Sequence, residues 1–176
     1  MHLLLLALVA TYPQNFGPVA PASPVLKTER IISAIEILDP ELACRRADLN
    51  SISSMPNMPY GPPWSRPHAL LVFSSDMDGV SETDVVGHIW YLESEAAAHR
   101  MFLHQSRNNE QMKTSRVVDF GSDGLGIDAT WLRGLHYDLT YRKGRFVVSI
   151  EGRSHDMVLR VGSVLDKALE EFEPTR

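Results

Sequence analysis

Leu135-His-Tyr-Asp-Leu-Thr-Tyr-Arg-Lys-Gly-Arg-Phe-Val-Val-Ser-Ile-Glu151 is the stretch that decides the fold of this chain. Apolar and polar residues alternate on both sides of Lys143-Gly144, which is the pattern of two strands that each bury one face. Two-residue turns of the X-Gly type join antiparallel strands and fix their register. The sequence therefore predicts a β-hairpin that turns at Lys143-Gly144.

A turn at this position predicts which residues face one another across the hairpin. One face is expected to be buried and the other open. The predicted pairs are Tyr141–Phe146, Leu139–Val148 and Tyr137–Ile150 on the buried face, and His136–Glu151, Asp138–Ser149 and Thr140–Val147 on the open face.

Residues 69–176 are expected to form one compact α+β domain around this hairpin. Ser94 and Ser154 are typical helix N-caps, and each precedes a segment with helical apolar spacing. Further strands are expected at 69–73, 84–92, 116–120 and 127–132. We predict an antiparallel sheet of about five strands, with the two amphipathic helices on one face.

Residues 26–68 are expected to hold short helices and a proline-rich loop. A helix begins near Thr28, and Asp39-Pro40-Glu41 predicts a second short helix, to about Ala47, that carries a half-buried Cys44. The proline-rich segment that follows includes Tyr60 and Trp64. Such a segment either binds a protein partner or wraps the domain, and we favour the second interpretation.

Residues 1–25 predict a signal peptide and a proline-rich tether. The apolar run at residues 3–10 suits a signal sequence but is too short to span a bilayer. A packed apolar strand or helix is the alternative. We therefore expect an extracytoplasmic or secreted protein, with a cytoplasmic location as the alternative.

The composition excludes several classes of protein. Hydrophobic residues make up 44% of the chain and charged residues 22%, which is typical of a globular protein. The formal net charge of −5 argues against a nucleic-acid partner. The single cysteine cannot form an internal disulfide or a zinc site built from several cysteines.

Candidate binding residues lie on the predicted open face. His136 is expected opposite Glu151, with Asp138 diagonal to it and His155 nearby in the sequence. A carboxylate beside an imidazole can transfer a proton or hold a metal, but an ordinary cross-strand polar pair is the favoured interpretation.

No cofactor is predicted for the chain, and no metal site. The glycine-rich segment at residues 121–126 leads into a strand, whereas a phosphate-binding loop leads into a helix. His99 and His104 do not share a helix face. Charged residues near the turns are expected to be solvated rather than to bind an anionic partner; they are Arg133, Arg142, Lys143 and Arg145.

A resemblance rests on three segments: Tyr91-Leu-Glu-Ser-Glu-Ala-Ala97, Gly121-Ser-Asp123 and Leu139–Ile150, followed by a closing helix. Over residues 84–172 this order resembles small bacterial extracytoplasmic α+β domains of the lipoprotein-like or sensor-like kind, which share no common activity. The resemblance implies a non-enzymatic binding or sensing domain. The alternative is a small-ligand carrier or hydrolase-like enzyme with a site near His136, Glu151 and His155.

Overall fold

The computed structural model describes residues 27–47, 67–75, 85–110, 114–121, 126–131 and 136–172. These residues form one antiparallel sheet with the strand order β1-β2-β3-β7-β6-β5-β4, together with three helices. The predicted α+β class is confirmed, although the sheet has seven strands rather than about five. The elements are α1 Thr28–Leu38, β1 Leu42–Arg46, β2 Ala69–Ser75, β3 Val85–Tyr91, α3 Glu95–Glu110, β4 Thr114–Val118, β5 Gly126–Trp131, β6 His136–Lys143, β7 Phe146–Gly152 and α4 His155–Glu170.

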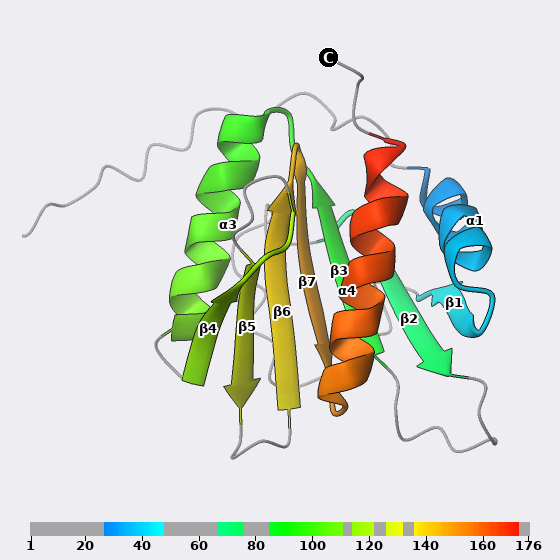
Figure 1. The fold of residues 1–176 in the computed structure, drawn as a ribbon. Coiled ribbons are helices and arrows are strands. Elements are labelled where there is room, and N and C mark those ends of the chain that lie inside the picture. The colour runs from blue at the N-terminus through cyan, green and yellow to red at the C-terminus, as the bar shows by residue number, and fades with distance from the viewer. Residues whose placement is uncertain are drawn as a thin grey trace, which may run out of the picture.

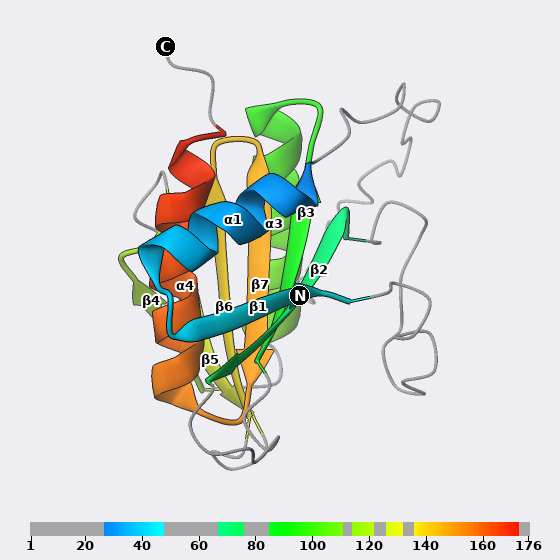
Figure 2. The ribbon, with the colours of Figure 1, turned by 90° about the vertical axis from the view of Figure 1, so that its right-hand side faces the viewer.

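Helices cover both faces of the sheet. Figures 1 and 2 show α4 and α1 on one face and α3 on the other, so the prediction that both amphipathic helices share one face is wrong. The physical reason is a second apolar patch, on the face turned away from α4. Trp90, Ile127 and Val147 form this patch, and α3 covers it with Ala98, Met101 and Phe102.

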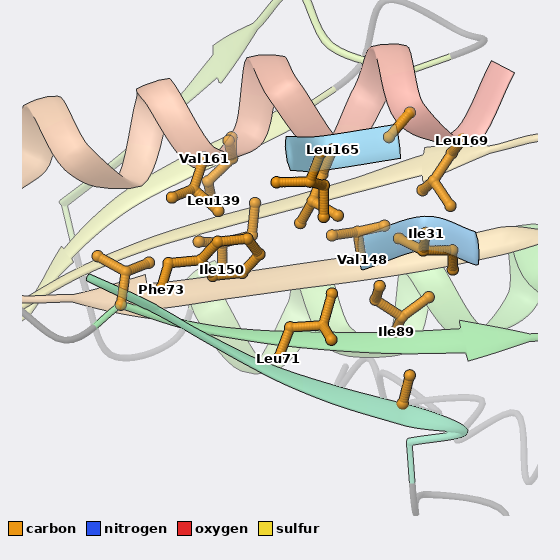
Figure 3. Close-up of a cluster of buried hydrophobic side chains, with 14 of the residues drawn as sticks. Ile31, Leu71, Phe73, Ile89, Leu139, Val148, Ile150, Val161, Leu165 and Leu169 are labelled. Carbon is orange, nitrogen blue, oxygen red and sulfur yellow. The ribbon is translucent and has the colours of Figure 1, made fainter. Parts of the chain in front are cut away.

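The main core lies between the sheet and the α1–α4 layer. Figure 3 shows Val161, Leu165 and Leu169 of α4 facing side chains of the central strands. Ile31 and Ile35 of α1 are fully buried in the same cluster. Residues 28–46 therefore share the sheet and the core of the later strands. None of the described helices has both the length and the apolar character needed to cross a membrane.

The central hairpin forms, but its register differs from the predicted one by two residues. Lys143 pairs with Phe146, so Gly144 and Arg145 make the turn, with Gly144 at a φ of 51°. Glycine adopts positive φ without the steric cost of a side chain, which favours it at the first turn position. A shift by two keeps every residue on its predicted face. It changes the partners, because Glu151 now lies opposite Asp138 rather than His136.

The predicted helix at residues 39–47 is wrong, because the chain forms edge strand β1 there and pairs with β2. Asp39 ends α1 instead of starting a helix. Its carboxylate accepts two hydrogen bonds of 2.7 Å from Arg160 of α4, and these bonds lower the pKa of Asp39. Cys44 is half-buried, as expected, but on a strand, and burial raises the pKa of its thiol to about 12.

The helix caps predicted at Ser94 and Ser154 are confirmed. Ser94 accepts a hydrogen bond from the Ala97 amide, and Ser154 accepts one from the Met157 amide. The helix predicted to begin near Thr28 does begin there, with Lys27 at its N-cap position and Thr28 buried.

Two of the charged residues that were predicted to be solvated, Arg142 and Lys143, are buried. Arg142 and Lys143 are only 8% and 7% exposed, and Arg133 lies outside the described residues. The Lys143 ammonium donates to Asp166 and Glu170 of α4 at 3.0 Å each. Burial lowers the pKa of Lys143, but the two hydrogen bonds outweigh this effect and raise the pKa above 10.5. This ion pair fastens the end of the hairpin to α4.

We predict that Lys143→Met lowers the free energy of unfolding by about 3 kcal/mol, because it leaves Asp166 without a cation. The other oxygen of Asp166 is buried and has no hydrogen-bond partner within the described part of the chain. Urea unfolding measures the change. A Lys143→Met/Asp166→Leu double variant should recover most of the loss, and equal losses in both variants would contradict this reading.

We also predict that Gly121→Ala lowers the free energy of unfolding by about 2 kcal/mol or more. Gly121 has a φ of 73°, a conformation that costs other residues about 1–2 kcal/mol. An added Cβ would also collide with the backbone carbonyl of Arg142. Thermal and urea unfolding test the change, with the exposed Asp119→Ala as a control that should stay close to wild type. Wild-type stability in Gly121→Ala would contradict the described geometry.

Candidate functional site

The candidate site is a polar cluster on the α3 side of the sheet, which we call the His88–Glu151–His136 cluster. Its three side chains come from β3, β7 and β6, which are adjacent at the centre of the sheet. His88 lies opposite Ser149, and Glu151 is two residues further along β7 on the same face. His136 reaches this face because it alternates with Tyr137 along β6.

Both oxygens of Glu151 accept hydrogen bonds from histidine. His88 Nε2 lies 3.0 Å from Oε1, and His136 Nε2 lies 3.4 Å from Oε2. An ionised carboxylate can only accept hydrogen bonds, so each imidazole donates from Nε2. One carboxylate therefore joins three neighbouring strands through side chains as well as through the backbone ladder.

The cluster extends from the interior to the surface. The exposed fractions of the side chains are 8% for His88, 22% for Glu151 and 33% for His136. The His88 ring stacks on Trp90, with ring centroids 5.9 Å apart. The rim that a ligand can reach consequently consists of the His136 ring and part of the Glu151 carboxylate.

Opposing effects set the charge of Glu151. Burial raises its pKa, but the hydrogen bonds from His136 and His88, with the charges of the two rings, outweigh burial and lower the pKa to about 2. Glu151 therefore stays ionised at every physiological pH. It can hold a fixed negative charge, but it is a poor proton acceptor near neutrality.

Asp138 adds a second carboxyl group directly opposite Glu151 across the strands. It is 7% exposed. The Thr140 hydroxyl donates to Asp138 over 2.9 Å and lies 3.3 Å from the Ser149 hydroxyl. The site thus combines two imidazoles, two carboxyl groups and two hydroxyl groups on one face.

His155 does not belong to this cluster, although the sequence suggested a common site. It begins α4 on the opposite face of the sheet, where its Nε2 lies 2.9 and 3.1 Å from the two oxygens of Asp128. Its ring packs against Tyr137. The predicted group is thus divided between two faces because residues 153–155 carry the chain from β7 around to α4. The other predicted binding residues, Tyr60 and Trp64, lie outside the described residues.

The sequence prediction missed His88. This residue lies in an apolar strand, and its place in the cluster depends on the pairing of β3 with β7, which are far apart in the sequence. The one signal was a histidine within an otherwise apolar stretch at residues 84–92. Within the residues that the structure describes, no three histidine, cysteine or acidic side chains are arranged to hold a metal ion.

Comparison of the chain with family models, with curated proteins and with solved structures found no match.

We predict that wild-type protein loses stability as the pH falls from about 4.5 towards about 2, and that Glu151→Gln lacks this component. The lowered pKa of Glu151 contributes stability that is complete above its ordinary pKa of 4.5 and is lost as the carboxylate becomes protonated. The full contribution is on the order of 3 kcal/mol.

Urea unfolding at pH 6, 4 and 3 measures this component. Exposed His99→Gln serves as the control and should follow the wild-type profile. Parallel profiles for wild type and Glu151→Gln would contradict the ion-pair geometry.

Proposed function

We propose that the chain is a non-enzymatic, extracytoplasmic binding or sensing domain. Its ligand would contact the rim formed by His136 and Glu151. The compartment rests on the apolar run at residues 3–10 and on the resemblance of residues 84–172 to extracytoplasmic domains.

The observation that carries the proposal is the engagement of both Glu151 oxygens by histidine. General acid–base catalysis is most efficient when the pKa of the group lies near the working pH. With a pKa of about 2, Glu151 is instead suited to holding a constant charge beside a donor. His136, with a third of its side chain exposed, can accept a hydrogen bond from a ligand at Nδ1, or donate one there when the ring is protonated.

A second candidate is an enzyme that uses His155 as a general base. The buried Asp128 holds Nε2 of His155 with both of its oxygens, and the His155 side chain is 29% exposed. A carboxylate that orients an imidazole in this way is common in catalytic sites. This candidate needs a substrate pocket beside α4, and the binding proposal does not.

Titration of the full chain, followed by two-dimensional NMR, tests the binding proposal. Acetate, inorganic phosphate, putrescine and L-arginine sample small anions and cations. We predict that at least one of them shifts resonances around His136 and Glu151, and that His136→Gln weakens this binding tenfold or more. His99→Gln, an exposed histidine of α3, should bind like wild type.

Two results decide against the proposal. Resonance shifts confined to residues outside the cluster would contradict a ligand site at this rim. Equal affinity in wild type and His136→Gln would contradict it as well. Turnover of p-nitrophenyl acetate or p-nitrophenyl phosphate that disappears in His155→Gln would favour the enzyme instead.

A further inference from the structure

The cluster places two histidines beside a pair of carboxyl groups. Glu151 and Asp138 lie opposite one another on adjacent strands, and like charges in that position repel. Protonated imidazoles of His88 and His136 would place positive charge beside these carboxyl groups, where both histidines already bond to Glu151.

Protonation of the two histidines would also strengthen their hydrogen bonds to Glu151. A donor that carries a charge makes a shorter and stronger bond to a carboxylate than a neutral donor does. Both imidazoles donate to Glu151, so adding protons strengthens the link between β3, β7 and β6. Histidine is the residue type that ordinarily changes charge between pH 5 and 8.

We propose that the His88–Glu151–His136 cluster is a proton-binding site through which the domain senses pH, and that proton uptake fastens β3 to β6 through Glu151. This inference rests on the proposed sensing function and names the proton as a ligand of the same face. The sequence distance between the linked residues makes the response tertiary rather than local, because His88 and Glu151 are 63 residues apart.

Few other charged groups face the cluster within the described ranges. On β6, Arg142 lies further along the same face and approaches Glu95 of α3 at 4.0 Å. The side of α3 that packs on the sheet presents Ala98, Met101 and Phe102, and β5 presents Ile127 and Ala129, none of which titrates. Leu70 of β2, opposite His88, is apolar.

Two histidines elsewhere also affect the pH dependence of stability. His155 pairs with Asp128 on the other face of the sheet. Burial lowers the pKa of His68, so its contribution is present at high pH and is lost on acidification, opposite to the cluster. The contributions of His155 and His68 to the pH dependence of stability cancel when a cluster variant is compared with the wild type, because both proteins contain these two histidines.

Thermal unfolding of the full chain at pH 8.0 and pH 5.5 tests the proposal. On passing from pH 8.0 to pH 5.5, the unfolding midpoint of the wild type should rise by about 2–4 °C relative to that of Glu151→Gln. A shift of this size is expected when a chain of this length gains one favourable charge interaction. His136→Gln lies at the exposed rim and should lose about half of this gain. It provides a second measurement if Glu151→Gln folds poorly.

The matched control is His155→Gln. Adding Glu151→Gln in this background should remove the same pH-dependent gain as in wild type, because the two histidine–carboxylate pairs lie on opposite faces. The proton-sensing inference would be overturned if the unfolding midpoint changed equally between pH 8.0 and pH 5.5 in wild type, Glu151→Gln and His136→Gln. Failure of all four NMR probes to bind, with the pH-dependent gain intact, would count against solute binding at the rim and leave proton sensing supported.

Discussion

The pairing of β6 with β7 sets what each face of the sheet carries. Side chains alternate along these two strands, whose register pairs Lys143 with Phe146, and they separate into an apolar set under α4 and a mixed set on the α3 side. The same register places Lys143 within reach of Asp166 and Glu170, which fixes the hairpin end to α4. The core and the link between Glu151 and His136 therefore depend on this local pairing, whereas His88 joins the cluster through the pairing of β3 with β7.

The two faces of the central strands have different roles. Under α4, side chains such as Leu139 and Ile150 are completely buried and contribute hydrophobic stabilisation. On the other side, α3 covers only part of the sheet with apolar contacts, and the central strands carry charged groups next to this patch. A buried polar group is costly unless it is fully hydrogen-bonded, and Glu151 meets this condition because each of its oxygens has a histidine donor.

Much of the fold could be predicted from local patterns, and the errors have physical causes. Alternation located the strands, and Ser94 and Ser154 marked the helix starts. The turn was misplaced because Gly144 suits either position of a two-residue turn, and only the tertiary partners of Lys143 decide between them. The helix expected after Asp39 does not form, because pairing of this segment with β2 outweighs the local helix-start pattern Asp39-Pro40-Glu41.

The candidate site was only partly predictable. His136, Asp138 and Glu151 share a face because of period-two alternation, which any hairpin register with an even shift preserves. His88 could not be placed because strand order is a non-local property. His155 was assigned to the wrong face because sequence proximity to Glu151 does not reveal that the chain turns between β7 and α4.

The central claim is that one carboxylate holds two histidines from different strands. A double-mutant cycle with His88→Leu and His136→Leu, followed by urea unfolding at pH 6, tests it most directly. With either histidine present Glu151 keeps a partner, and with neither it becomes a partly buried unpaired charge. The double variant should therefore lose at least about 0.5 kcal/mol more than the sum of the single losses. Additive losses would contradict a shared carboxylate.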